Sequence, residues 1–173
     1  MNKKFSTKTL VLAAVLTALS VVLTRFFSVQ LTSTMRIGIG PLPIIMSGII
    51  LGPIFGGMVG LVADLIGFLI NPGGNFHLGF TLSSVLTGVL PGIVAMLVNK
   101  NNDKLNLTII LSVISVYLPV HLFLNTLWLK VLMHSGFWIL FSERALKVAI
   151  ESVVVGFILS PIMKKMMKLF YKS

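Results

Sequence analysis

The chain has 173 residues, of which 56% are hydrophobic and 10% charged, and its formal net charge is +10. Soluble domains carry about 25% charged residues, so this composition excludes a soluble globule and indicates an integral membrane protein. A membrane-spanning helix needs roughly 20 apolar residues. We therefore expect a single transmembrane domain over residues 1–173 with five or six spans. The absence of cysteine excludes disulfides and thiolate metal sites.

The basic residues are clustered at the ends of apolar runs, which explains the net charge by membrane topology rather than by nucleic-acid binding. Because cytoplasmic loops are enriched in lysine, we expect both termini in the cytoplasm. The first apolar run, Leu10 to Phe27, is followed by no convincing cleavage site, so we expect it to be retained as a span. The clustered lysines are Lys3, Lys4, Lys8, Lys100, Lys104, Lys164, Lys165, Lys168 and Lys172.

The apolar runs predict an all-α protein with six transmembrane helices, at 8–28, 41–53, 57–71, 78–99, 107–131 and 139–164. The second and third look too short for a full crossing. Gly48, Gly52, Gly56 and Gly60 recur every fourth residue, a spacing that lets helix backbones approach closely. Short helices broken by glycine and proline can also line transport sites. Residues 29–40 are the longest external loop, which is either a lid or a simple connection.

Polar residues within the third and fourth spans are candidate site residues. The carboxylate of Asp64 is suited to bind a ligand amine, to relay a proton, or to pair with a lysine or arginine. Thr81, Ser83 and Ser84 cluster near the outer end of the fourth span. Hydroxyls in helices often bond to their own backbone, so these three alone do not define a site.

In the fifth span, His121, Asn125 and Trp128 are spaced by four and three residues and share one helical face. The Asn125 amide supplies donors and an acceptor, and Trp128 supplies a flat face for stacking. The alternative for Trp128 is a place in the interfacial aromatic belt. His121 lies one turn deeper, where an interior histidine with satisfied hydrogen bonds is more common than a ligand contact.

In the sixth span, Arg144, Lys147 and Glu151 form a second stripe with the same spacing. Lys147 and Glu151 are placed to neutralise each other. The remaining positive charge, on Arg144, would suit an incoming carboxylate. Arg25 and Arg36 would add to this positive charge. The alternative is that they lie at helix ends and only extend their charged groups to the membrane surface.

Several functional classes lack their motifs. The chain has no G-x-x-x-x-G-K-[ST] sequence for ATP and no H-E-x-x-H sequence for a metal protease. Its three histidines are scattered, and no carboxylates are closely paired. We therefore expect no catalytic residues, metal or cofactor.

Over nearly its whole length the chain resembles the substrate-binding S components of energy-coupling factor (ECF) vitamin transporters, and specifically the folate members. The resemblance rests on RIGIGPLPIIMSGIILGPIFGGMVGLVADLIG from Arg36 to Gly67, PGGNFHLGFTLSS from Pro72 to Ser84 and NTLWL from Asn125 to Leu129, followed by Arg144 and Lys147. The glycine-rich pattern is typical of all S components, whereas the GFTLS and NTLWL strings indicate the folate group.

The resemblance implies a folate-binding subunit of a bacterial plasma membrane importer that captures the vitamin from outside. It also implies a transmembrane coupling subunit (EcfT-like) and two ABC-type ATPase subunits as partners, with Ala14 and Ala18 matching the family's contact motif for the coupling subunit.

Folate itself suggests roles for the polar residues. Asn125, Trp128 and Asp64 would meet the pterin ring, and Arg36, Arg144 or Lys147 its glutamate tail.

Three alternatives remain open at this point. The chain could be an S component for another vitamin, such as thiamin or pantothenate. It could be an intramembrane enzyme that uses Asp64 and Glu151 as acid and base, although these lie on different helices. It could also be a membrane scaffold without a ligand.

Overall fold

The structure, a computed structural model, describes residues 6–30, 36–71, 77–98, 104–133 and 136–171, apart from the side chains of residues 30, 36 and 169–171. Within this part of the chain, five helical segments are long and apolar enough to cross a membrane, and a sixth is shorter. The elements are α1 (Thr7–Arg25), β1 (Val29–Gln30), β2 (Arg36–Ile37), α2 (Pro41–Leu51), α3 (Pro53–Ile70), α4 (Leu78–Val98), α5 (Leu105–Val116), the π-helix η1 (Tyr117–Leu124), α6 (Asn125–Met133) and α7 (Phe137–Tyr171).

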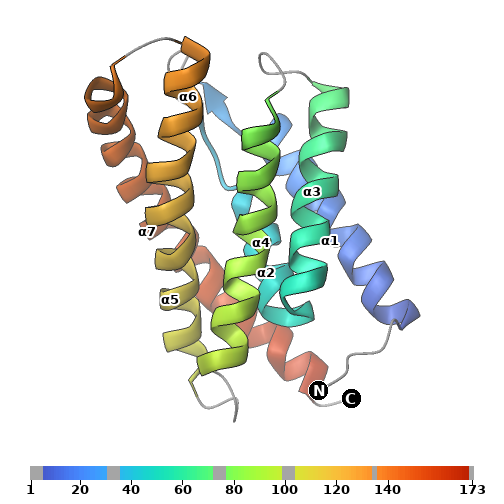
Figure 1. Ribbon diagram of the computed structural model, residues 1–173. Coiled ribbons are helices and arrows are strands. Elements are labelled where there is room, and N and C mark those ends of the chain that lie inside the picture. Colours follow the sequence, from blue (N-terminus) through green and yellow to red (C-terminus); the bar gives the residue numbers. More distant parts are fainter. Residues whose placement is uncertain (1–5, 31–35, 72–76, 99–103, 134–135, 172–173) are drawn as a thin grey trace.

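The bundle has two distinct ends. One, which we call the terminal end, carries the start of α1, the finish of α7, the finish of α4 and the start of α5 (Figure 1). The other, which we call the hairpin end, carries the antiparallel pair of β1 and β2, where Val29 faces Ile37. The expected all-α fold is therefore confirmed apart from these two strands of two residues each. The helix ends that flank the lysine-rich break thus lie at the same end as the start of α1 and the finish of α7, as expected.

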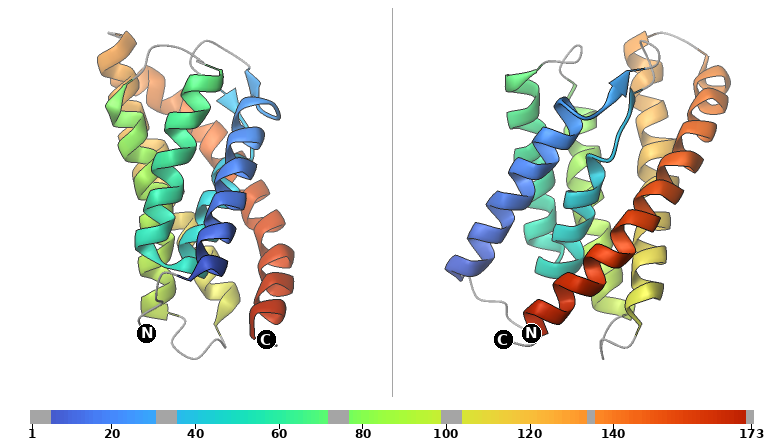
Figure 2. Two further views of the ribbon diagram at one scale, coloured as in Figure 1. Left: turned by 90° about the vertical axis from the view of Figure 1, so that its right-hand side faces the viewer. Right: turned by 180° about the vertical axis from the view of Figure 1, so that it is seen from behind.

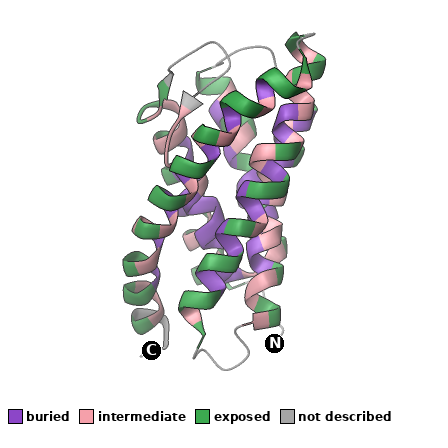
Figure 3. Ribbon diagram, turned by 90° about the vertical axis from the view of Figure 1, so that its left-hand side faces the viewer, coloured by how far each residue is buried: buried purple, intermediate pink, exposed green. Residues whose placement is uncertain are grey.

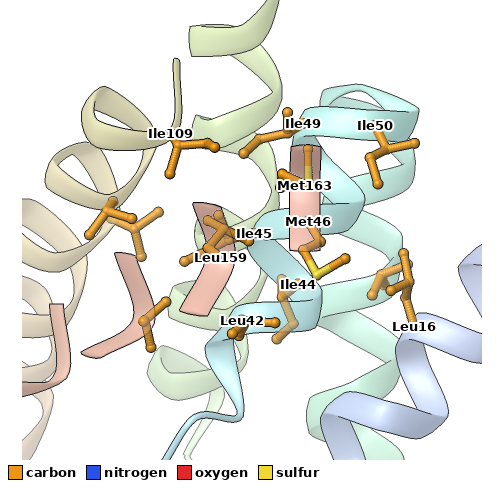
Figure 4. Close-up of a cluster of buried hydrophobic side chains, with 14 of the residues drawn as sticks. Leu16, Leu42, Ile44, Ile45, Met46, Ile49, Ile50, Ile109, Leu159 and Met163 are labelled. Carbon is orange, nitrogen blue, oxygen red and sulfur yellow. The ribbon is translucent and has the colours of Figure 1, made fainter. Parts of the chain in front are cut away.

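The short helix α2 lies at the centre of the bundle. Every residue from Leu42 to Leu51 is buried, and the right-hand view in Figure 2 shows α2 between α1 and α7 with α3 and α4 behind it. Figure 3 shows that the buried ribbon lies in the middle of the bundle. A helix that is apolar all round needs such a position. Side chains from three other helices converge on α2 in Figure 4: Leu16 from α1, Ile109 from α5, and Leu159 and Met163 from α7.

The prediction that the third span is short was wrong. α3 begins at Pro53 and has 18 residues, which is enough for a full crossing. The connection from α2 is the single residue Gly52, whose φ of 92° suits glycine because glycine has no Cβ. Pro53 then begins the next helix, where its missing N–H costs no hydrogen bond.

Close packing by the repeated glycines is confirmed at three of the four positions. A Cβ on Gly56 or Gly48 would overlap the Gly88 carbonyl oxygen of α4, and a Cβ on Gly60 would overlap that of Ser84. The backbones of α3 and α4 therefore touch, as small residues allow.

The fifth span is one continuous helical run whose middle is a π-helix. Pro119 lies inside this stretch and has no N–H for an intrahelical bond. At its end, the N–H of Asn125 donates to the carbonyl oxygen of Val120, five residues earlier. A π-turn of this kind is frequent at functional sites. The last helix, α7, continues to Tyr171, seven residues beyond its predicted end.

The glycine contact gives a first prediction. Gly88→Ala should lower the midpoint of thermal unfolding in detergent, because the added methyl group forces α3 and α4 apart, and overpacking costs about 1–3 kcal/mol. The control is Gly156→Ala on α7, where a Cβ would meet no atom within 4 Å. The control should unfold at an unchanged or slightly higher temperature, because alanine is the better helix former. Equal midpoints for the two variants would contradict the packing argument.

Candidate functional site

Trp128 of α6 is held against the first turns of α4. Its indole N–H donates to the Ser83 hydroxyl at 3.2 Å, and a Cβ on Gly79 would overlap the indole ring. The imidazole of His77 lies on the same side, with ring centroids 5.6 Å apart. Trp138, in contrast, is 77% exposed. Trp128 therefore faces into the bundle, which agrees with a site position.

One turn deeper, the buried polar residues come from α6 and η1. The amide of Asn125 is only 8% exposed, and its Oδ1 has no hydrogen-bond partner among the described residues. The His121 imidazole stacks on Tyr117 with centroids 4.9 Å apart, and its Nε2 is 3.4 Å from the Thr87 hydroxyl. His121 thus has interior partners, as expected.

Arg144 of α7 reaches the π-helix. Its Nη2 donates to the backbone carbonyl of His121, within η1, at 3.2 Å. Arg144 is 6% exposed, its Nε has no hydrogen-bond partner, and it forms no ion pair in the described part of the chain. It is therefore a buried cation with a free donor.

The predicted pairing of Lys147 and Glu151 is confirmed, with Nζ and Oε2 3.6 Å apart. The other carboxylate oxygen of Glu151 accepts the backbone N–H of Gly38 at 2.9 Å. Glu151 therefore joins α7 to the chain that descends from the hairpin to α2. With Glu151 neutralising Lys147, one positive charge is left over on this face of α7.

We call Tyr117, His121, Asn125, Arg144, Lys147 and Glu151 the buried polar cluster. Its groups are suited to bind an anion and a polar ring: a guanidinium and an ammonium supply charge, and the Asn125 amide supplies donors and an acceptor. No grouping of histidine and carboxylate ligands for a metal occurs in the described residues.

Three other predicted residues lie away from this cluster, where α3 meets α4. The Thr81 hydroxyl donates to Asp64 Oδ2 at 2.7 Å, and the backbone carbonyl of Ser84 packs on Gly60. Asp64 is half-buried and Thr81 is buried. It is the neighbouring Ser83, not Ser84, that contacts Trp128.

The remaining predicted residues lie at the hairpin end and along the middle of α1. Arg36 is in β2, opposite Gln30, but its side chain lies outside what the structure describes. Ala14 and Ala18 are exposed on one apolar face of α1, together with Val11 and Val15.

Sequence reasoning missed the contacts made by Ser83, Thr87, Tyr117 and Gly38. Pro119 was the available signal for the π-helix that places Tyr117, because proline inside a helix disturbs its bonding. No local spacing connects Gly38 with Glu151, which is 113 residues away.

Comparisons with known proteins agree with this arrangement. Residues 4–168 match the family model of the ECF-type riboflavin transporter S component. The chain is 33% identical over 137 residues to the folate transporter FolT of Clostridium novyi (strain NT), covering 79% of this chain and 77% of that protein. The crystal structure of FolT bound with folic acid superposes with a TM-score of 0.80 at 26% identity, covering 92% of this chain and 95% of that chain. The chain therefore belongs to the S components of ECF-type transporters, and it is a multi-pass membrane transport subunit rather than an enzyme.

Proposed function

We propose that this chain binds folate from outside a bacterial cell and delivers it inward together with a transmembrane coupling subunit and two ATPases. The observation that carries the proposal is the buried Arg144. Its guanidinium donates to the carbonyl of His121, one helical turn before the buried Asn125, and its Nε has no hydrogen-bond partner among the described residues. The similarity to FolT and to its complex with folic acid supports the choice of vitamin.

The charge of the buried polar cluster favours folate over other vitamins. Folate carries two carboxylates on its glutamate tail, whereas thiamin is a cation and pantothenate carries one carboxylate. Within the buried polar cluster, Arg144 and Lys147 carry two positive charges against the one negative charge of Glu151, which favours an anion. In this proposal Arg144 and Lys147 bind the tail, with Arg36 near the hairpin end, and Asn125 and Trp128 bind the pterin ring. Asp64, Thr81 and Ser84 would contribute only if the ligand reaches α3.

The two tryptophans allow a direct binding test. In purified Trp138→Phe protein, Trp128 is the only tryptophan, and folate should quench its fluorescence in a saturable way because the pterin ring stacks nearby. The matched variant Trp128→Phe retains only the exposed Trp138 and should show little quenching. A lack of saturable quenching at micromolar folate in the Trp138→Phe protein would sink the proposal.

The second ligand prediction concerns charge. Arg144→Ala should weaken folate binding about 10- to 150-fold, the equivalent of losing one hydrogen bond to a charged group. Lys130→Ala removes an exposed cation from α6 and should change the affinity little. A competition panel with riboflavin, thiamin and pantothenate identifies the vitamin. An equal loss of folate affinity in Arg144→Ala and Lys130→Ala would show that binding depends on the overall charge of the protein and not on the position of Arg144.

The variant Glu151→Gln tests whether Glu151 contributes mainly to folding or to folate binding. The glutamine keeps an acceptor for the Gly38 N–H but removes the carboxylate charge that pairs with Lys147, and breaking a buried ion pair costs about 3–5 kcal/mol. We expect a large drop in the unfolding temperature and a smaller change in folate affinity. Lys147→Met in the same chain should restore stability. A stable Glu151→Gln protein that has lost folate affinity would instead place Glu151 in the site.

Ala14 and Ala18 provide the test of partner assembly. Replacing both by leucine should leave folate binding intact but prevent co-purification with the coupling subunit and ATPases, because bulkier side chains keep helix backbones apart. Val131→Leu on exposed α6 is the control and should assemble normally. Normal assembly of the double variant would show that this face of α1 only contacts lipid.

A further inference from the structure

A groove runs along the outside of the bundle between α5–η1 and α7, and Tyr117 is the one member of the buried polar cluster among its described lining residues. Its volume is about 1060 Å³, and its walls are almost entirely apolar. We call it the lateral groove. Ile109, Val113 and Leu118 line one wall and Ala149, Gly156 and Phe157 the other, and Asn106 and Lys164 lie at the terminal end.

The lateral groove has the length of a lipid chain. At a helical rise of about 1.5 Å per residue, the wall from Asn106 to Leu122 extends for about 20–25 Å. The hydrocarbon core of a bilayer is about 30 Å thick. The groove therefore extends from the headgroup level at the terminal end past the middle of the core, in the direction that an acyl chain takes.

Small residues on α7 keep the groove open instead of bringing helices together. On α4, a Cβ at Gly88 would overlap the backbone of α3, whereas a Cβ at Gly156 would meet no atom within 4 Å. The same residue type thus serves close helix packing in one place and borders empty space in the other. The few polar side chains of the lining include Ser152, whose hydroxyl already donates to the Ala149 carbonyl of its own helix. These features favour a flexible aliphatic occupant over another helix.

The positive charge at one end of the lateral groove indicates which kind of lipid headgroup would bind there. Lys164 is the one lysine, arginine, aspartate or glutamate in the groove lining of the described chain, and it lies at the terminal end. Lys104, Lys165 and Lys168 are exposed at the same end. A phosphate at this level would be attracted by Lys164 and its neighbours, while no described carboxylate lines the groove to repel it.

We propose that the lateral groove is a specific binding site for one anionic phospholipid, with its headgroup at Lys164 and an acyl chain along Gly156. This inference is independent of folate binding, since neither residue belongs to the buried polar cluster.

The test compares two lipids with identical acyl chains. Native mass spectrometry of the full chain in a neutral detergent would measure one-to-one binding of phosphatidylglycerol and phosphatidylcholine. Phosphatidylglycerol should bind about five-fold more tightly, the preference expected from one lysine near a headgroup. Lys164→Gln should abolish this preference, whereas Lys165→Gln, at the same end but outside the groove lining, should retain it.

A second pair of variants tests the acyl chain. Gly156→Leu fills the groove and should weaken binding of both lipids at least ten-fold, whereas Val154→Leu, on α7 but outside the groove lining, should have no effect. Folate binding serves as the folding control for all four variants.

Equal affinity for the two lipids in the unaltered protein, or unchanged binding in Gly156→Leu, would overturn the proposal. Loss of folate binding in the unaltered protein would contradict the proposed function without affecting the lipid result.

Discussion

The structure depends on how the chain satisfies its backbone polar groups where it is not helical. Within a membrane, irregular backbone is tolerated only where protein or water supplies hydrogen bonds. Between β2 and α2 the chain descends into the bundle, and two distant side chains meet this need: the Glu151 carboxylate accepts the Gly38 N–H at 2.9 Å, and the Ser20 hydroxyl donates to the Gly40 carbonyl at 2.9 Å. Because this descent is stabilised, α2 can begin inside the bundle and remain short and buried.

The same carboxylate organises the charges on α7. Glu151 must be ionised to serve both Gly38 and Lys147, and its burial makes a nearby cation necessary. Lys147 supplies that cation, so Arg144, nearly two turns away, is left to bind a backbone carbonyl of the π-helix. In the proposed function, folding and ligand recognition are therefore coupled: the anion that stabilises the entry to α2 also determines which cation stays available. This coupling explains why a substitution at Glu151 should affect stability first.

The sequence predicted those features that follow from local periodicity. Apolar runs located the helices, and spacings of three and four residues placed Asn125 with Trp128 and paired Lys147 with Glu151. The spacing of the glycines predicted close packing, but it did not show that Gly52 is a turn and Gly88 the opposing contact. Such features depend on which helices are neighbours in space, and no spacing within one helix contains that information.

The glycines show most clearly that the role of a residue in a helix depends on its neighbours in space. In α3 and α4, missing Cβ atoms allow two backbones to touch, and dispersion contacts stabilise the pair because lipid offers no hydrophobic driving force between helices. In α7, Gly156 has no facing backbone, so its missing side chain leaves volume beside α5 that the bilayer must fill. α7 is 35 residues long. One side of it faces the bundle and carries the buried Lys147–Glu151 ion pair. Another side borders the lateral groove, where we propose that lipid binds. The groove borders the same helix that presents Arg144 inward, but Lys164 and Gly156, its proposed lipid contacts, lie outside the proposed folate site, so lipid binding can be tested separately.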